Sequence, residues 1–533
     1  MNASFFNHLW HISSRRAARE FQRAAEDVAE TQEHLLQNYL ARNRDTVYVA
    51  QHFSNLPFTT YDDYLPYIER IAEGEQNVLT TEPVKMFELS SGSTTASKMI
   101  PYTRTLQSEF GRGLSAWITD LFMHYPALKS GPAYWSISPL TEGRRQTRAG
   151  IPIGFEEDSV YLGTLGALTE SVFALPNLVK HISDINTFRY VTLLFLLRCE
   201  NLRLISVWNP TFLTLLLAPL SEWWESLLKD ISDGTLTPPA LIDPHICNVL
   251  LKKLSRNQRR AKNLSQIKSN NYASIWQHLT LISCWADGAS QSYAKELQAQ
   301  FPNVTIQPKG LLATEAFVSF PLIGKTGNAL AVTSHYFEFL DEDGEIHLAH
   351  QLERSKTYSV IVTTGGGLYR YQLNDIVEVT GFYHQVPCLK FIGKGDRVSD
   401  YFGEKLNEQF VTNVLERLFE KHQITPVFAM LAPDETGDFH YVLFIELRDE
   451  LPNYLIAELD SALRENFHYD YCRRLGQLGE AHILQVTRGA EMYIRACHSR
   501  GQRLGDIKPA ILQKTTGWEE WFAIEQSKEA VKG

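Results

Sequence analysis

The chain has 533 residues, of which 44% are hydrophobic and 21% are charged, with a formal net charge of −10. A chain of this length and composition can bury a large core in more than one domain, which excludes an intrinsically disordered protein. The negative charge argues against nucleic acid or an anionic membrane as a partner.

The cysteines and apolar segments predict the compartment. Six cysteines are scattered without a CxxC pair or a zinc-site spacing, which is typical of reduced thiols. No signal-peptide core is recognisable near the N-terminus. The most apolar runs, Tyr190–Leu197 and Thr211–Leu220, are shorter than the roughly 20 residues that span a bilayer and are expected to be buried helices. We therefore predict a soluble cytoplasmic protein.

The first part of the chain is predicted to be mainly helical. Apolar residues recur at three- and four-residue spacing over Arg15–Asn43, which predicts one long amphipathic helix. A shorter helix is expected at Tyr61–Ala72. A third is expected at Thr103–His124, where a threonine is available as the N-cap.

A loop of small hydroxyl residues precedes the third helix. Phe87–Tyr102 reads FELSSGSTTASKMIPY and contains a single lysine, Lys98. Gly92 permits a positive φ, and successive N–H groups can then form an anion-binding nest. A neutral cradle with one cation, lying between a strand and a helix, suits a polyphosphate. The alternative interpretation is a plain turn, because clusters of serine and glycine usually form turns.

The middle of the chain predicts an α/β architecture. Strand-like and helical segments alternate there, which favours a largely parallel sheet. The clearest strands are expected at Leu202–Trp208, Leu279–Trp285 and Val304–Ile306.

The last part of the chain begins as β structure and then changes character. Ala331–Glu345 is predicted to be a β-hairpin, and strands are expected to continue to Phe382. Glycines and charges interrupt the strands around Gly393–Gly403. The remaining residues predict a compact α+β domain of about 130 residues, a usual domain size. We place the domain boundary near residue 395.

Three further segments are candidate sites, each with a structural alternative. In Gly310–Phe317, GLLATEAF, Glu315 could bind Mg²⁺ and Thr314 a phosphate, since Mg²⁺ often takes one or two carboxylates plus phosphate oxygens. On spacing alone, an edge carboxylate paired with Lys309 is favoured. Asp375, expected between two strands, could hold a ribose diol or form an Asx-turn.

Two charged positions lie further along. The segment Gly393–Leu406 is interpreted by itself as an exposed linker, and Lys508 as an isolated surface lysine.

The order of these sites resembles the ANL superfamily of adenylate-forming enzymes. Its phosphate-loop consensus is met at Ser90–Thr94 and Lys98, whereas Thr95 and Ser97 depart from it. The Thr-Glu pair of the superfamily corresponds to Thr314 and Glu315. Its ribose motif is similar to Tyr369–Asp375, YRYQLND, which has one extra residue and Asn374 in place of glycine. Its hinge pattern is matched at Gly393, Asp396, Gly403 and Lys405, with Lys394 replacing arginine and Asp400 replacing lysine.

Within that superfamily the chain resembles the auxin-responsive (Gretchen Hagen) acyl-acid amido synthetases, as a bacterial-type member. The segments that carry this resemblance include VLTTEPVKMFELSSGST, SVWNPTFL, CWADG and GLLATEAFVSFP. The resemblance covers nearly the whole chain and does not identify the substrate.

The resemblance implies an α/β fold with a large N-terminal domain (1–394) that binds ATP and the acid, and a small mobile α+β domain (395–533). It implies a monomeric ligase that uses ATP and Mg²⁺ to convert a small carboxylic acid into an acyl-adenylate. The acyl group then passes to an amine, such as that of an amino acid.

The implied site residues fall into four groups. The β- and γ-phosphates would be bound by Ser90, Ser91, Gly92, Ser93, Thr94 and Lys98, the α-phosphate by Thr314, and Mg²⁺ by Glu315. Other nucleotide contacts would come from Ala313, Tyr369, Asp375 (at the ribose), Lys394 and Lys405. Lys508, Thr314 and Lys98 would be catalytic, and Asp396 would be the hinge.

Three alternatives stay open. A related ligase would pass the acyl group to a thiol or a hydroxyl. A non-catalytic homologue would bind nucleotide or acid without reaction. A scaffold built on the Arg15–Asn43 helix would bind no nucleotide.

Overall fold

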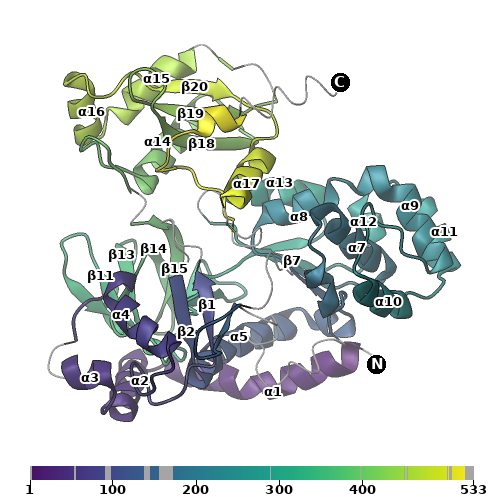
Figure 1. Ribbon diagram of the computed structural model, residues 1–533, viewed down its shortest axis with the longest axis horizontal. Coiled ribbons are helices and arrows are strands. Elements are labelled where there is room, and N and C mark those ends of the chain that lie inside the picture. Colours follow the sequence, from purple (N-terminus) through teal and green to yellow (C-terminus); the bar gives the residue numbers. More distant parts are fainter. Residues whose placement is uncertain are drawn as a thin grey trace. The chain divides into compact units, whose positions relative to one another are not determined.

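The computed structural model describes residues 3–52, 56–90, 98–136, 145–154, 172–287, 290–395, 398–448, 451–452, 454–500, 502 and 507–522. Its contacts divide the chain into two compact units (Figure 1). The first unit comprises Met1–Trp285, Glu296–Leu373 and Val377–Lys390, and the second comprises Ala286–Lys295, Asn374–Ile376 and Phe391–Gly533. Among the described residues, no helix is both long enough and apolar enough to cross a bilayer.

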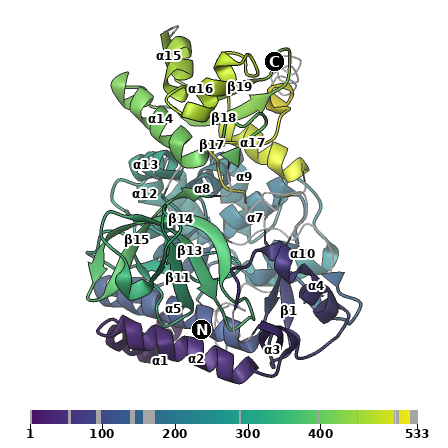
Figure 2. The same ribbon diagram turned by 90° about the vertical axis from the view of Figure 1, so that its left-hand side faces the viewer.

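The N-terminal helical segment consists of two helices, α1 (Ala3–Ala24) and α2 (Val28–Asn43). The predicted single helix over Arg15–Asn43 is therefore wrong. Asp27 starts α2, because its carboxylate accepts a hydrogen bond from the Glu30 N–H at 3.0 Å. Figure 2 shows α1 lying along α5 (Arg104–His124), and α2 packs on the seven-stranded sheet described below.

The next two helices are α3 (Val47–His52) and α4 (Tyr61–Ala72). The predicted bounds of α4 are confirmed. The Asp63 carboxylate accepts a hydrogen bond from the Thr60 N–H at 2.7 Å, which satisfies one of the free donors at the helix start.

The serine- and glycine-rich loop connects two antiparallel strands, β1 (Met86–Ser90) and β2 (Lys98–Tyr102), with Ser90 opposite Lys98. The loop was expected between a strand-like segment and the helix at Thr103–His124, and β2 lies between the loop and that helix. Helix α5 follows β2, and its predicted threonine cap is confirmed because the Thr103 hydroxyl accepts from the Leu106 N–H at 3.1 Å. The sheet has the order β2-β1-β5-β4, with β4 at Arg145–Gln146 and β5 at Pro152–Ile153.

A four-stranded sheet of wholly parallel pairs confirms the predicted α/β class. Its order is β3 (Ala133–Trp135), β6 (Leu204–Ser206), β7 (Leu281–Cys284) and β8 (Thr305–Pro308). The connecting helical elements are η1 (Pro126–Ser130), η3 (Asn177–His181), α7 (Ile185–Arg198), α8 (Pro210–Leu217), α9 (Leu220–Asp233), α10 (Pro244–Lys253), α11 (Gln258–Ser265), α12 (Tyr272–Ile275) and α13 (Gln291–Gln300). The apolar runs predicted to be buried helices form α7 and α8 and belong to the core beside this sheet.

A seven-stranded sheet has the order β12-β11-β13-β14-β15-β10-β9. The expected hairpin is confirmed as β11 and β12, whereas the expected break at Asp375 is wrong because β14 runs through it. Asn374 has a φ of 58° there, which asparagine tolerates better than most residues. The bounds are β9 Ser319–Pro321, β10 Asn328–Leu330, β11 Tyr336–Leu340, β12 Ile346–Leu348, η5 Ala349–Gln351, β13 Thr357–Thr363, β14 Tyr371–Tyr383 and β15 Val386–Lys394.

The second unit is a smaller α+β structure around the sheet β18-β19-β20. Strands β18 and β19 are antiparallel, and β19 and β20 are parallel. Its elements are β16 (Val398–Ser399), β17 (Leu406–Asn407), α14 (Glu408–Lys421), β18 (Phe428–Asp434), β19 (His440–Glu446), α15 (Tyr454–Leu463), α16 (Phe467–Arg474), β20 (His482–Gln485) and α17 (Gly489–Ser499).

Candidate functional site

The predicted phosphate loop lies at the tip of the β1–β2 hairpin. Its residues Ser91, Gly92, Ser93 and Thr94 lie outside the described residues, while Ser90 ends β1 and Lys98 begins β2. The Lys98 ammonium lies 5.6 Å from the centre of the Tyr61 ring. The Tyr61 hydroxyl accepts a hydrogen bond from the Met99 N–H at 2.8 Å. The start of α4 therefore fixes the strand that carries the lysine.

Thr314 and Glu315 form the tip of a tight turn. Leu312 pairs with Phe317, and the Ala313 N–H donates to the Ala316 carbonyl at 3.0 Å. The turn is tied to β2, because the hydroxyl of its last residue, Tyr102, donates to the Thr314 carbonyl at 2.6 Å.

This contact brings two predicted site segments together. Lys98 and Tyr102 are four residues apart on β2, so their side chains leave the same face of the strand. The strand that begins with the predicted phosphate-binding lysine thus ends on the turn that carries Thr314 and Glu315. Glu315 is only 8% exposed, and a carboxylate at such a position needs a cation or donors.

Lys309, which spacing alone suggested as the partner of Glu315, lies elsewhere. Its ammonium is 4.7 Å from the centre of the Trp208 ring, and the described residues include no ion pair between Lys309 and Glu315. The described part of the chain also holds no group of three metal-ligating side chains. A site with one carboxylate still suits Mg²⁺, which can take its other ligands from phosphate and water.

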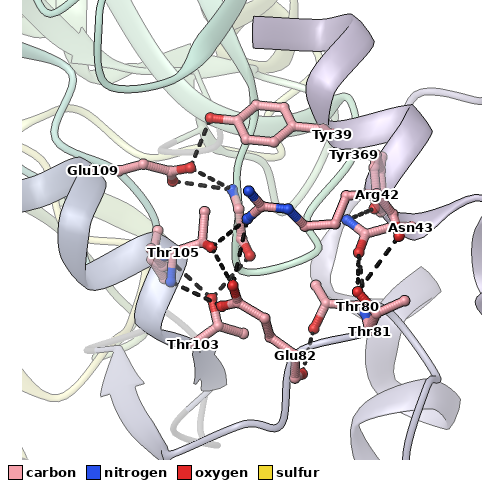
Figure 3. A network of polar contacts seen from close by, with 12 residues as sticks. Tyr39, Arg42, Asn43, Thr80, Thr81, Glu82, Thr103, Thr105, Glu109 and Tyr369 are labelled. Carbon is pink, nitrogen blue, oxygen red and sulfur yellow. Dashed lines mark hydrogen bonds and ion pairs between the residues drawn. The ribbon is translucent and has the colours of Figure 1, made fainter.

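A buried network behind this turn is centred on Glu109 of α5 (Figure 3), and the sequence reasoning missed it. Glu109 is fully buried, and its carboxylate accepts from the Tyr39 hydroxyl at 2.8 Å and from the Gly365 N–H at 3.0 Å. His335 Nδ1 lies 3.0 Å from the same carboxylate. The opposite nitrogen, Nε2, accepts from the Phe317 N–H at 3.0 Å. The network thus joins the Thr314–Phe317 turn to the glycine turn that begins at Gly365.

The hydrogen bond at Nε2 of His335 defines its tautomer. Since Nε2 accepts a hydrogen bond, the ring proton belongs on Nδ1, where it faces Glu109. Burial, and then the negative charge of Glu109, raise the pKa of the Tyr39 hydroxyl well above its usual value. Tyr39 therefore stays protonated and acts as a donor.

The same network continues to the surface around the first turn of α5 (Figure 3). The Glu82 carboxylate accepts from the Thr105 N–H at 3.0 Å, and Arg42 donates to the Thr105 hydroxyl at 2.7 Å. The Thr103 hydroxyl donates to the Gly365 carbonyl at 2.9 Å. An acidic side chain at a helix N-terminus is favourable, so this end of α5 is held firmly against the glycine turn.

Tyr369 is a core residue. It is fully buried, and its hydroxyl accepts from the Asn43 amide at 2.8 Å and donates to the Leu79 carbonyl at 3.3 Å. Its ring stacks on Tyr48 at 5.5 Å. Because protein groups enclose this phenol, we assign Tyr369 a supporting role in place of the expected nucleotide contact. The neighbouring Arg370 makes a bidentate pair with Glu338, with both hydrogen bonds at 3.0 Å.

The structure pairs two predicted nucleotide contacts of the second unit. Asp375 is only 2% exposed, and the Lys394 ammonium lies 2.8 Å from its carboxylate. The Gly395 N–H donates to the Asn374 carbonyl at 2.7 Å, which holds the end of β15 beside this part of β14.

The other predicted residues of the second unit differ in their surroundings. Asp396, the predicted hinge, lies outside the described residues. Lys405 is exposed and has a φ of 45°. Lys508 is exposed, and its carbonyl accepts from the Tyr493 hydroxyl at 3.1 Å. Further along, the Leu431 N–H of β18 donates to the Ile511 carbonyl at 2.7 Å. The segment that carries Lys508 is therefore attached to an edge strand.

Comparison with known proteins identifies three successive family domains. The GH3 family N-terminal domain matches residues 17–306, the GH3 family central domain matches residues 328–394, and the GH3 family C-terminal domain matches residues 408–517.

Similar curated proteins come from plants. An indole-3-acetic acid-amido synthetase, GH3.2 of Arabidopsis thaliana, is 26% identical over 87% of this chain and 93% of its own length. A jasmonoyl–L-amino acid synthetase, JAR6 of Nicotiana attenuata, is 23% identical over 88% of each chain. These plant relatives give no support to the prediction of a bacterial-type member.

The fold matches a solved structure of the same kind. The AtGH3.15 acyl acid amido synthetase in complex with 2,4-DB has a TM-score of 0.83 at 20% identity, and the match covers 96% of both chains. The likeness supports the α/β fold with a large N-terminal part and a smaller C-terminal part.

Proposed function

The chain belongs to the GH3 family, and we propose that it is an ATP-dependent acid–amine ligase. It joins an organic acid to ATP as an acyl-adenylate, with release of pyrophosphate, and passes the acyl group to an amine. The observation that carries this proposal is the succession of the three family domains over residues 17–306, 328–394 and 408–517. We further propose that the family shares its mechanism with the ANL adenylate-forming enzymes and that the amine is that of an amino acid.

The proposed chemistry must overcome repulsion between negative charges. A carboxylate approaches the α-phosphate of a polyanionic nucleotide, and charge grows on the departing pyrophosphate. Fixed donors that face those oxygens stabilise the transition state, and the loss of one such donor costs roughly 3–4 kcal/mol in well-studied oxyanion sites. A loop rich in hydroxyl and N–H donors with one cation meets this need.

In the first unit, we assign the β- and γ-phosphates to Ser90–Thr94 and Lys98. The Thr314 hydroxyl binds the α-phosphate, and Ala313 adds a main-chain contact beside it. The support for this assignment is the hydrogen bond from Tyr102 to Thr314, which links the lysine-bearing strand to the turn. Glu315 would hold Mg²⁺, which neutralises phosphate charge when bound.

In the second unit, we assign the ribose hydroxyls to Asp375. The Lys394 ammonium, 2.8 Å from this carboxylate, orients it as an acceptor. Lys394 and Lys405 are proposed as further nucleotide contacts.

We propose a functional division into residues 1–394 and 395–533, with Asp396 as the hinge. Lys508 neutralises the adenylation transition state and is withdrawn when the C-terminal domain rotates, so that the amine can enter. That the protein is a monomer and lies in the cytoplasm remains a prediction.

The first test replaces Lys508 by alanine. Acid-dependent ATP–pyrophosphate exchange should fall by about 10²–10³-fold, in line with the loss of a fixed transition-state partner. ATP affinity, measured by calorimetry, should change little. Lys421→Ala removes another exposed lysine of the second unit and serves as the control. Normal exchange in Lys508→Ala would remove Lys508 from the chemistry.

The second test replaces Asp375 by asparagine, which keeps the size of the side chain. ATP binding itself should weaken, by about tenfold or more for a lost charge-assisted hydrogen bond. Unaltered ATP affinity would contradict the ribose assignment.

The acceptor needs a separate experiment. The adenylate is trapped with hydroxylamine, and amines, thiols and hydroxyl compounds are then compared as acceptors. Transfer to a thiol or a hydroxyl would replace the amine in the proposal. A protein that binds ATP but shows no exchange with any acid would be a non-catalytic homologue.

A further inference from the structure

The Thr314–Phe317 turn is held at both ends by side chains from other elements. At its start, the Thr314 carbonyl accepts from the Tyr102 hydroxyl of β2 at 2.6 Å. At its end, the Phe317 N–H donates to His335 Nε2 at 3.0 Å. Between these two contacts lie the side chains to which we assign the α-phosphate and Mg²⁺. Their direction therefore depends on an outside group at each end of the turn.

His335 lies just before β11 and is fully buried. The rings of Phe110 and Phe337 stand edge-on to its imidazole, with centroids 5.9 Å and 6.0 Å away. The other ring nitrogen, Nδ1, lies 3.0 Å from the Glu109 carboxylate. A buried N–H that loses its acceptor keeps the full cost of its desolvation, so the Phe317 N–H depends on this imidazole.

The main chain that carries the imidazole is itself fixed. The His335 carbonyl accepts from the Gln32 side-chain amide of α2 at 2.8 Å, and the Phe337 N–H donates to the oxygen of the same amide at 2.8 Å. Arg112 of α5 donates to the Ser334 carbonyl at 3.1 Å. Two helices thus hold the segment around His335 and give the imidazole a rigid support.

Packing against α5 fixes how close the turn comes to the helix but not its direction. The Phe317 ring lies directly on Gly113, where an added Cβ would come within 2.4 Å of the ring. Packing of this kind is non-directional, whereas a hydrogen bond weakens steeply when its angle is distorted. The bond to His335 Nε2 is therefore the contact that sets the orientation of the peptide at the end of the turn.

The hydrogen bond requires a neutral imidazole with its acceptor at Nε2. The Phe317 main chain offers a donor, so the ring proton belongs on Nδ1, on the side of Glu109. The Glu109 carboxylate also accepts from the Tyr39 hydroxyl and the Gly365 N–H. These two donors hold the carboxylate beside Nδ1, so the network favours the tautomer that the turn requires.

We propose that His335 is a positioning residue of the adenylation site. Its neutral imidazole orients the Thr314–Phe317 turn, and Glu109 holds the imidazole in the accepting tautomer. The turn then presents the Thr314 hydroxyl to the α-phosphate and the Glu315 carboxylate to Mg²⁺. This inference rests on the proposed ligase function, and it assigns His335 to the nucleotide and not to the acid.

The test compares two substitutions that each keep one end of the imidazole. In His335→Gln the amide oxygen can reach the place of Nε2 and accept from Phe317, whereas in His335→Asn the shorter side chain reaches only the place of Nδ1. In His335→Asn, kcat for acid-dependent pyrophosphate exchange should fall about tenfold or more, since a displacement of about 1 Å can cost up to about 10²-fold. In His335→Gln it should stay within about threefold, because the acceptor is kept.

Three further measurements on the full chain separate positioning from a general loss of structure. The affinity for ATP with Mg²⁺, by calorimetry, should weaken about three- to tenfold in His335→Asn and change little in His335→Gln. KM for the acid should be unchanged in both variants, with phenylacetate, benzoate and hexanoate as the acids. The transition temperature of unfolding records the loss of stability in each variant separately.

His11→Asn is the matched control. His11 is another buried histidine of the first unit, on α1, and its ring stands edge-on to Phe122 with the centroids 5.8 Å apart. The substitution removes the same volume from the interior. Exchange and ATP affinity should equal those of the unaltered chain.

The outcomes separate this inference from the ligase proposal. Normal exchange in His335→Asn, an equal loss in His335→Gln, or a rise in KM for the acid as large as the loss of ATP affinity would overturn the inference and leave the ligase function intact. Absence of exchange with all three acids would overturn the ligase function, and the affinity for ATP would then test the inference by itself. A chain that binds no ATP would overturn both.

Discussion

Glu109 and Lys309 are both buried ionisable side chains of the first unit, but the groups that surround their charges differ. The Glu109 carboxylate contacts Tyr39, Gly365 and His335 at 2.8–3.1 Å. The Lys309 ammonium faces an aromatic ring at 4.7 Å and no carboxylate among the described residues.

The difference separates a satisfied buried charge from an unsatisfied one. A buried charge that is hydrogen-bonded by its neighbours holds several elements in one arrangement, whereas a buried charge without a counter-ion lowers stability. Glu109 therefore supports the candidate site from behind, and Lys309 has no counter-ion among the described residues.

The largest effect should follow from the loss of Glu109. Glu109→Leu leaves the buried Tyr39 hydroxyl and the Gly365 N–H without their acceptor, and should destabilise the first unit by about 3–5 kcal/mol. Calorimetric unfolding of the full chain measures this as a lower transition temperature. Glu69→Leu, at an exposed position on α4, should change it little. Equal changes of the transition temperature in both variants would contradict the distinction drawn between Glu109 and Lys309.

Lys309→Met should act in the opposite direction. Replacement of an unpaired buried charge by an apolar side chain of similar length should raise the stability of the folded chain by about 1–4 kcal/mol near pH 6. The same calorimetry applies, with the exposed Lys325→Met as the control. A less stable Lys309→Met variant would show that the ammonium is already well satisfied.

The gain from Lys309→Met should depend on pH. The folded pKa of Lys309 is about 7 and the unfolded value is 10.5, so the unfolded chain holds the extra proton between these values. Stability of the unaltered chain therefore rises with pH in this window relative to the variant. The advantage of the variant should be fully present below about pH 7 and shrink by up to about 1.4 kcal/mol per pH unit above it. An advantage that stays constant from about pH 6 to about pH 9 would contradict burial of the ammonium.

The smallest effect should come from the exposed edge of the Glu109 network. Arg42 is 52% exposed in its ion pair with Glu82, and such pairs contribute about 0–1 kcal/mol. Arg42→Ala should therefore leave the transition temperature nearly unchanged, and the small difference should disappear in high salt. A loss as large as that of Glu109→Leu would mean that the network is stabilised from its surface.

The sequence predicts elements whose causes are local. The bounds of α4 and the threonine cap of α5 follow from periodicity and capping. Apolar spacing over Arg15–Asn43 does not reveal the break between α1 and α2, where Asp27 caps the second helix. Asp375 was expected between two strands, but β14 continues through it and accommodates a single left-handed residue, Asn374.

The Glu109–His335 contact is not visible in the sequence, because it depends on how α5 and the seven-stranded sheet pack. The buried serines Ser206 and Ser283 did have a signal in the sequence. Leu204–Trp208 reads LISVW and Leu281–Trp285 reads LISCW, so a serine occupies the same place in two buried parallel strands, where apolar residues are expected on both faces.

The attachment of the Lys508 segment to β18 has a consequence for the proposed reaction. Its main chain is held by the Tyr493 hydroxyl and by the Leu431 N–H, so its order is established when the second unit folds. Bringing the ammonium to a reacting phosphate then restricts only side-chain rotamers, which costs at most about 2 kcal/mol, in place of about 1–2 kcal/mol for every residue of a flexible loop. In the proposed mechanism the main chain at Lys508 is therefore already in place, and the proposed rotation of the domain sets when the lysine acts.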